Sequence, residues 1–239
     1  MNTKGIAEFV ISTGIDQWPT GVQEKAKDCI MDVIGTMFAG LKTKPACISR
    51  DFVLEIGSKK ESTLFGNNSK VSSLFAAYAN NIAAITLDYD DGHPRSALHP
   101  GTVICPATFA LAERENSSGR EFLEAVVAGY EVAIKASLCL RNSPKHPELH
   151  GGGTGGAYGV SAACARLLKL DENKMAQAIA IASQYAPVCA GFKVFISGPM
   201  TKESIGWGGM AGMTASLLAQ RGFTGPATAT IFDDADIAG

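Results

Sequence analysis

Residues 22–41, VQEKAKDCIMDVIGTMFAGL, decide the fold class of this chain more clearly than any other stretch. Apolar residues recur there at intervals of three and four, the spacing that places them on one face of an α-helix. Gly35 and Gly40 predict close contact with a neighbouring helix, because glycine has no side chain to hold a partner away. The apolar positions that define the face are Val22, Ala26, Cys29, Ile30, Val33, Ile34, Met37 and Phe38.

The same periodicity continues along most of the chain, whereas the alternation of β-branched residues that indicates strands is nearly absent. One short extended piece is expected at residues 63–65. The sequence therefore predicts an all-α fold, with one large multi-helix domain over residues 1–226 and a tail over residues 227–239. The further helices are expected at residues 45–57, 74–87, 101–115, 120–140, 160–168, 174–185 and 202–221.

Composition limits the classes of protein that this chain can represent. Its 239 residues are 46% hydrophobic and carry a formal net charge of -2, which argues against disorder and against a nucleic-acid partner. No apolar run is long enough to predict a membrane span, and a secretory signal pattern is missing at the start. The six cysteines are widely spaced, so we expect a cytoplasmic protein without a disulfide framework.

The chemistry is expected to lie in residues 86–101, TLDYDDGHPRSALHPG, between two apolar helical runs. Three carboxylates, two of the four histidines and Arg95 gather there, although only 18% of the chain is charged. Pro100 is expected to begin the next helix, since proline is tolerated at a first helical position. His99 would then lie at the positive end of that helix, where the imidazolium is disfavoured and a base is favoured.

Two further polar stretches precede helices. Residues 141–150 contain Lys145, His146 and His150 and lead into the glycine run at 151–159. Bare backbone N–H groups at a helix start can bind an anion, but glycines also let helices cross closely, and the pattern leaves both readings open. His150 and Thr154 are the better candidates for a site there. A third loop carries Lys193 and leads to Lys202, whose cation at a helix start is unfavourable unless it binds an anion.

If these three loops meet, cations for substrate carboxylates lie beside groups that transfer protons. That combination suits proton abstraction next to a carboxylate, followed by elimination or reprotonation. A divalent metal held by Asp88, Asp90, Asp91 and the histidines is the alternative, as in a metal-dependent hydratase. We expect no metal and no other cofactor, because no complete ligand set occurs at a recognisable spacing.

In order along the chain, these motifs resemble the MmgE/PrpD family, which contains 2-methylcitrate dehydratase, cis-aconitate decarboxylase and iminodisuccinate epimerase. The resemblance covers essentially the whole chain. Its elements are LDYDD at 87–91, HPG at 99–101, His150 with Thr154, Gly156 and Gly159, ACARLLKLD at 163–171, Lys202, Gly212, and LLAQRGFTGP at 217–226.

The resemblance implies a helical MmgE/PrpD domain and cofactor-independent chemistry on small di- or tricarboxylates. Members of the family are about twice this length and carry an α+β lid domain, so the chain is expected to lack the lid, whose start would coincide with the tail at 227–239. A second chain that supplies the lid is one expectation, and a homodimer is another. No nucleic acid or membrane partner is expected.

The resemblance also assigns residues. Asp88, Asp91, His99, His150 and Lys202 would be catalytic. Together with the polar loop residues themselves, it leads us to expect Gly92, His93, Arg95 and Thr154 to bind the substrate. Gly92 falls where family members often have threonine. The expected activity is that of a lyase, a carbon–oxygen dehydratase for a citrate-like acid such as 2-methylcitrate. The alternatives are an epimerase or decarboxylase of the same family, and an inactive helical scaffold that dimerises or binds carboxylates.

Overall fold

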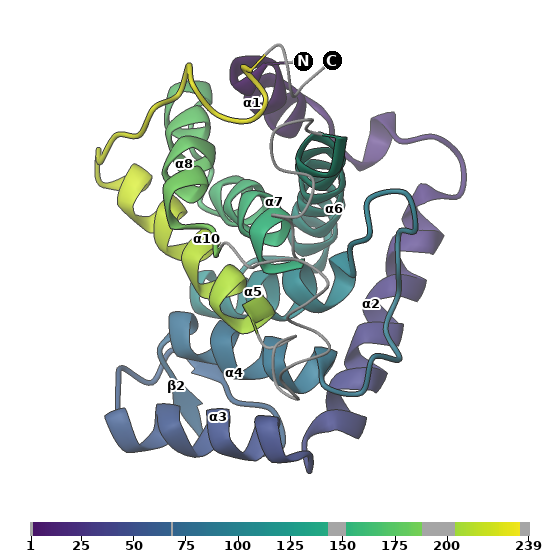
Figure 1. The fold of residues 1–239 in the computed structure, drawn as a ribbon, viewed down its shortest axis with the longest axis vertical. Helices are drawn as coiled ribbons and strands as arrows, with labels where there is room; N and C mark the ends of the chain where they lie inside the picture. Colours follow the sequence, from purple (N-terminus) through teal and green to yellow (C-terminus); the bar gives the residue numbers. More distant parts are fainter. Residues whose placement is uncertain (1, 68, 143–151, 188–203, 235–239) are drawn as a thin grey trace.

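A computed structural model describes residues 2–67, 69–142, 152–187 and 204–234 of the chain. Helices make up most of these residues, and the predicted all-α fold is confirmed (Figure 1). The helices are α1 (Thr3–Ser12), α2 (Val22–Gly40), α3 (Lys44–Ile56), α4 (Ser73–Ile85), α5 (Pro100–Glu115), α6 (Gly119–Asn142), α7 (Gly152–Leu167), α8 (Glu172–Tyr185) and α10 (Ser204–Gln220), with a short 3₁₀ turn η1 at Ile15–Gln17.

Several of these helices begin close to the residues that the sequence predicts, and side chains cap their first turns. The Ser72 hydroxyl accepts the backbone N–H of Phe75 at the start of α4, and the Asp171 carboxylate accepts that of Lys174 at the start of α8. Before α6, Ser118 and Glu121 bond reciprocally as a capping box. These bonds satisfy backbone N–H groups that have no partner within their own helix.

Helix α7 lies in the middle of the domain, between α6 on one side and α8 and α10 on the other (Figure 1). Two groups of buried side chains meet around it. One group joins α2, α4 and α5, and the other joins α1, α8 and the described end of the chain. In the second group the Phe232 ring packs edge-on against Tyr158 of α7, and the Asp233 carboxylate accepts the backbone N–H of Thr3. The residues after 226 therefore pack on the helical domain as far as they are described.

The glycine run beside α7 is helical from Gly152 onward, so it does not form a separate loop before the helix. A Cβ atom built at Gly159 would lie 2.4 Å from the carbonyl oxygen of Gly129 in α6, and one at Gly156 would lie 2.4 Å from Val103 in α5. Real Cβ atoms do not approach so closely, so these glycines permit the helix crossings. Of the two readings that the sequence left open, the structure supports close packing for the described part of the run.

Building a Cβ atom also distinguishes the two glycines of α2. A Cβ at Gly40 would lie 2.0 Å from the carbonyl oxygen of Ala83 in α4, which confirms the predicted close contact. A Cβ at Gly35 would have no atom within 4 Å, so the same prediction was wrong there. The sequence pattern could not distinguish the two positions, because only Gly40 faces the neighbouring helix.

Two features outside the helices complete the fold. The expected extended piece is a small antiparallel hairpin of β1 (Ser62–Thr63) and β2 (Lys70–Val71). The described cysteines, all but Cys189, are free thiols. In the described ranges no helix combines the length and the apolar character needed to cross a membrane.

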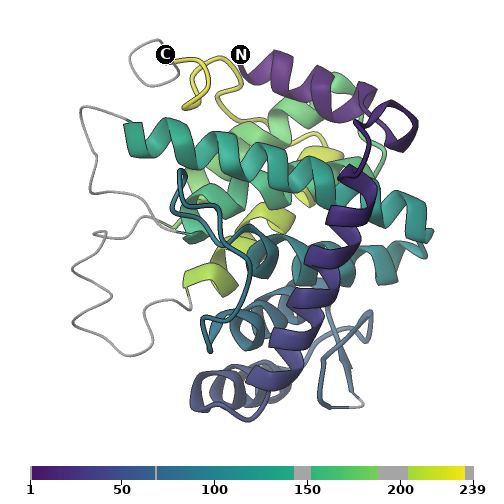
Figure 2. The same ribbon diagram turned by 90° about the vertical axis from the view of Figure 1, so that its right-hand side faces the viewer.

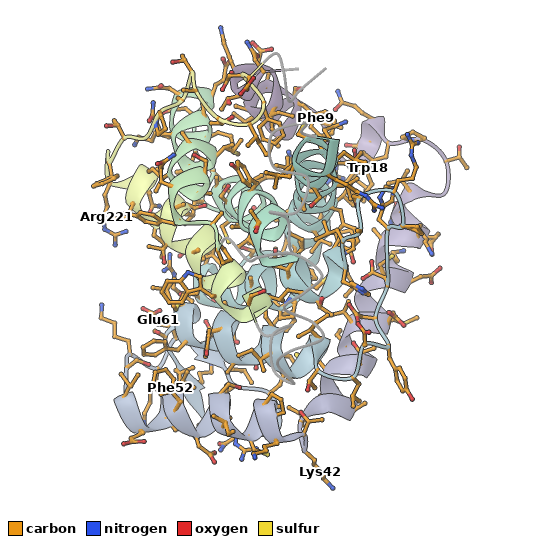
Figure 3. All side chains as sticks on the ribbon, viewed as in Figure 1. Phe9, Trp18, Lys42, Phe52, Glu61 and Arg221 are labelled. Atoms are coloured by element: carbon orange, nitrogen blue, oxygen red, sulfur yellow. The ribbon has the colours of Figure 1, made fainter. Side chains whose placement is uncertain are left out.

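Helix α3 exposes apolar side chains on its outer face. Ile48, Phe52 and Ile56 follow one another at intervals of four, and each is about half exposed, at 51%, 51% and 53%. Figure 3 labels Phe52 on this outer helix, away from the central α7. Exposed apolar surface of this kind is consistent with association, and the dimer remains a prediction.

Candidate active site

The acidic stretch of the sequence forms the long loop between α4 and α5. Figure 1 shows the loop passing beside α2, and in Figure 2 its tip reaches α6. There the Arg141 guanidinium, close to the end of α6, donates to the carbonyl oxygens of Pro94 at 3.0 Å and Arg95 at 3.3 Å. The contact therefore joins the tip of the loop to the end of α6.

His99 is the N-cap of α5, and Pro100 occupies the first turn, as the sequence predicts. Two carboxylates flank its ring. Asp90 Oδ2 lies 3.1 Å from His99 Nδ1, and Asp88 Oδ1 lies 3.8 Å from His99 Nε2. The imidazole side chain is 40% exposed, so a substrate can reach it. A histidine between two carboxylates at a helix N-terminus has the composition of a proton-transfer site.

The two carboxylates beside His99 differ in their surroundings. The side chain of Asp90 has no exposed surface, and Oδ2 accepts the hydroxyl of Thr102 at 3.1 Å. Oδ1 of Asp90 is buried with no hydrogen-bond partner among the residues that the structure describes. Asp88, in contrast, is 46% exposed, and its φ of 57° is a left-handed conformation that aspartate tolerates better than most residues.

Asp91 anchors the loop to the helices beneath it. Its Oδ1 accepts the backbone N–H of Gly101 at 2.9 Å, and its side chain also hydrogen-bonds Tyr130 of α6. Burial raises the pKa of the Asp91 carboxyl, although the bonds to Tyr130 and Gly101 act in the opposite direction. Burial also raises the pKa of the Tyr130 hydroxyl far above its ordinary value, so tyrosine remains a neutral donor to Asp91. The catalytic role predicted for Asp91 is untested, and its contacts are those of a residue that holds structure.

The predicted substrate-binding residues of the loop differ in their surroundings. His93 uses Nδ1 in a 2.8 Å hydrogen bond with the Ser96 hydroxyl, inside the turn that its backbone forms with Leu98. Arg95 is exposed within that turn. Gly92 lies beside the candidate base, since a Cβ built on it would have the His99 ring at 4.0 Å and no nearer atom. A Cβ atom at this position would therefore fit.

The other predicted residues lie away from the loop or outside the described residues. Thr154 is buried in α7 and donates its hydroxyl to the carbonyl oxygen of Pro187. His150 and Lys202, both predicted to be catalytic, lie outside the residues that the structure describes, as do Lys145, His146 and Lys193. The structure therefore joins Asp88, Asp91, Gly92, His93, Arg95 and His99 in one loop and leaves the three-loop convergence a prediction.

Asp88, Asp90 and His99 each offer one donor atom, and these atoms lie within 4.8 Å of one another, so a divalent metal has to be considered. The two carboxylates, however, approach different ring nitrogens. Their donor oxygens nevertheless lie within 4.8 Å of each other, so the two carboxylates do not lie on opposite sides of the ring. Three donors are fewer than the four of a closed zinc site, but they equal the protein ligands of a catalytic site that keeps one position open. The arrangement fits proton transfer and also fits a metal, so the metal alternative stays open.

A groove of about 510 Å³ lies between α2 and α6. Its walls are largely apolar, and none of the predicted site residues lines it. Tyr130 is shared between the groove and the anchor of Asp91. Titratable side chains also line the groove (Lys25, Cys29, Tyr130 and Glu131), but we place the candidate site at the loop, where the predicted residues gather.

Two residues of the site were missed or undervalued from the sequence. Asp90 was recognised only as a possible metal ligand, although it is the carboxylate nearest to the His99 ring. Tyr130 lies within an apolar helix. Nothing in the sequence around it indicates that its hydroxyl reaches Asp91, which lies far earlier in the chain. The Asp-x-Asp spacing could have identified Asp90, because residues two apart in an extended segment point to the same side, which groups Asp90 with Asp88.

Comparisons with known proteins give one family for this chain. Residues 4–235 match the MmgE/PrpD N-terminal domain. Cis-aconitate decarboxylase of Homo sapiens is 29% identical over 93% of this chain and 47% of its own length. The corresponding figures are 27%, 93% and 46% for cis-aconitate decarboxylase of Mus musculus, and 26%, 92% and 46% for that of Aspergillus terreus. The chain spans about half the length of the curated relatives it matches.

Proposed function

Because this chain belongs to the MmgE/PrpD family, we propose that it forms the helical part of a lyase that acts on a citrate-like tricarboxylate. The observation that carries the proposal is the His99 ring, exposed at the N-terminus of α5 with Asp90 at 3.1 Å and Asp88 at 3.8 Å. A lyase of this kind must move a proton at a carbon beside a carboxylate, and a positioned imidazole does so near neutral pH.

Decarboxylation of an unsaturated tricarboxylate such as cis-aconitate is the reaction we favour. The relatives named above are cis-aconitate decarboxylases, and this supports decarboxylation over the dehydration of 2-methylcitrate that the sequence motifs suggested. In decarboxylation the C–C bond to one carboxylate breaks, CO₂ leaves, and the electron pair that remains on carbon takes a proton. His99 in its protonated form would supply that proton, with Asp88 beside it on the exposed side.

Dehydration of a hydroxy acid is the second candidate, because it can use the same groups in the opposite order. His99 would remove a proton from the carbon next to a carboxylate, and the hydroxyl would leave with a proton from an acid. No metal is required for either reaction, and both are proposed without a cofactor. His150, Lys202 and the predicted substrate-binding residues would serve substrate binding and proton transfer in both cases.

The test supplies cis-aconitate and 2-methylcitrate to the chain and follows CO₂ release and unsaturated-product absorbance separately, each with and without EDTA. We expect CO₂ from cis-aconitate, no effect of EDTA, and loss of turnover in His99→Gln. The matched control is Lys27→Gln, which removes an exposed cation from α2 and should leave turnover unchanged. Product from 2-methylcitrate alone would favour dehydration, and loss of activity with EDTA would favour the metal.

If the chain shows no turnover, binding calorimetry with citrate tests whether it still has a carboxylate site. Binding that weakens in His99→Gln would support a carboxylate site whose catalysis needs a lid domain from elsewhere in the protein or from a second chain. No binding of citrate or cis-aconitate would contradict the proposal for this domain and favour the inactive scaffold. Light scattering tests the proposed homodimer in the same samples.

A further inference from the structure

We propose that the groove between α2 and α6 is a second ligand site, which takes a free α-amino acid with a large apolar side chain. Figure 2 shows the start of α2 lying against α6, the two helices that line the groove. Its volume of about 510 Å³ is that of a small-molecule site, for which about 300–1,000 Å³ is usual. None of the residues predicted for the active site lines the groove, so the proposal does not depend on the proposed function.

The walls of the groove are apolar and come from both helices. Ala26 of α2 and Val126 of α6 are buried, and Val22, Val127 and Ile134 are partly buried beside them. Removing apolar surface from water is the main favourable contribution in sites of this kind. The groove therefore favours a ligand with a large apolar side chain, since a small one would leave most of the walls in contact with water.

Two opposite charges line the same groove. Lys25 belongs to α2 and Glu131 to α6, and both are exposed. In the described part of the chain, neither side chain forms an ion pair or a hydrogen bond. A zwitterion complements both charges, with its carboxylate towards Lys25 and its ammonium group towards Glu131. A fatty acid or a simple amine would complement only one of them and repel the other.

The start of α2 supports this orientation of the ligand. Thr20 and Gly21 line the groove just before the helix, and Gly21, the N-cap, gives the first turn no side-chain cap. The N–H groups of a first helical turn carry partial positive charge and favour an anion. Glu24 lies in the same turn and is already paired with Lys27. The carboxylate of the ligand is therefore expected beside Lys25 at this end of α2.

Tyr130 connects the groove with the loop between α4 and α5. It lines the groove, and it hydrogen-bonds the side chain of Asp91. Asp91 Oδ1 in turn accepts the backbone N–H of Gly101 at 2.9 Å, at the start of α5. A ligand packed against Tyr130 restrains this chain of contacts. Occupancy of the groove should therefore slow hydrogen exchange at the Gly101 amide.

The first experiment is calorimetric titration of the wild-type protein with L-phenylalanine and three analogues. 3-Phenylpropanoate lacks the ammonium group, phenethylamine lacks the carboxylate, and glycine lacks the apolar side chain. We expect phenylalanine to bind and glycine not to bind. The two aromatic analogues should bind about two- to fivefold more weakly than phenylalanine, because exposed charge pairs contribute little. No binding of phenylalanine, or equal binding of the three aromatic compounds, would overturn the proposal.

Cys29 reports whether the ligand lies in this groove. Its thiol lines the groove and is partly exposed, whereas Cys47 of α3 is also partly exposed but does not line it. We expect phenylalanine to slow the alkylation of Cys29 by N-ethylmaleimide and to leave Cys47 unchanged, as followed by peptide mass spectrometry. An unchanged rate at Cys29 under saturating phenylalanine would place the ligand elsewhere and contradict the site.

Charge variants test the two ends of the ligand separately. Lys25→Gln should remove the preference for phenylalanine over phenethylamine, and Glu131→Gln should remove the preference over 3-phenylpropanoate. Lys27→Gln is the matched control, because this exposed cation of α2 does not line the groove and should leave both preferences intact. Circular dichroism checks the fold of each variant. Both preferences surviving in Lys25→Gln and Glu131→Gln would overturn the assignment of the charges.

Hydrogen exchange of the wild-type protein completes the test, because it needs no variant to fold and no turnover. We expect slower exchange at the Gly101 amide with phenylalanine than without it. Binding with unchanged exchange at Gly101 would refute the connection through Tyr130. A protein that binds phenylalanine but does not turn over any tricarboxylate would count against the proposed function only.

Discussion

The loop between α4 and α5 and the glycine-rich start of α7 look alike in the sequence and differ in the structure. Each follows an apolar helix and is rich in residues that break helices. The loop stays irregular, because Asp91 and Arg141 tie it to its neighbours through side-chain hydrogen bonds. The glycine run is helical, and its lack of side chains lets α5 and α6 approach α7. Hydrogen bonds fix the first region, and close packing fixes the second.

The largest expected effect concerns the close packing of α7 against α6. In Gly159→Ala, the new methyl group would meet the Gly129 carbonyl oxygen at 2.4 Å, so the helices must separate. We expect a loss of about 1–3 kcal/mol in the free energy of unfolding, measured by urea denaturation. Gly35→Ala is the control, because its methyl group meets no atom within 4 Å and should stabilise α2 by about 0.5–1 kcal/mol. Equal losses in the two variants would contradict the assignment.

A smaller effect, which depends on pH, tests how Asp91 holds the loop between α4 and α5. Burial raises the pKa of Asp91, so the folded protein holds this proton more tightly than the unfolded chain does. The favourable contribution of protonated Asp91 is present below the unfolded pKa and is lost as pH rises through the folded pKa. Asp91→Asn keeps an acceptor for the Gly101 N–H but cannot ionise. Its stability relative to the wild type should therefore increase from acidic to neutral pH, as measured by urea denaturation. A constant difference across that range would refute the explanation.

The smallest effect concerns the tip of the loop. Arg141→Ala removes the donor to the Pro94 and Arg95 carbonyl oxygens, and because the site is exposed the cost should be about 0.5–1.5 kcal/mol and local. Hydrogen exchange should speed up at the His93 amide, which bonds the Leu98 carbonyl oxygen. Arg120→Ala, at the opposite end of α6, should leave that amide unchanged. Unchanged exchange in Arg141→Ala would mean that the loop holds its shape without α6.

The helices were predictable because their signals are local. The apolar spacing of 22–41, the serine before α4 and the aspartate before α8 each act within one or two turns, and the observed bounds lie close to the expected ones. The start of α7 was placed too late, because eight residues of glycine-rich sequence have low intrinsic helix propensity. Tertiary contacts with α6 and α10 compensate for that propensity, and no local pattern reports them.

The sequence by itself determined the helical class, the family and the loop in which His99 lies. It did so because helix periodicity, caps and motif order are all properties of nearby residues. Only the tertiary structure decided that Asp90 is the carboxylate nearest the ring, that Asp91 bonds Tyr130, and that Gly40 but not Gly35 touches another helix. These facts depend on the direction in which a side chain or a bare backbone faces once distant helices have packed together.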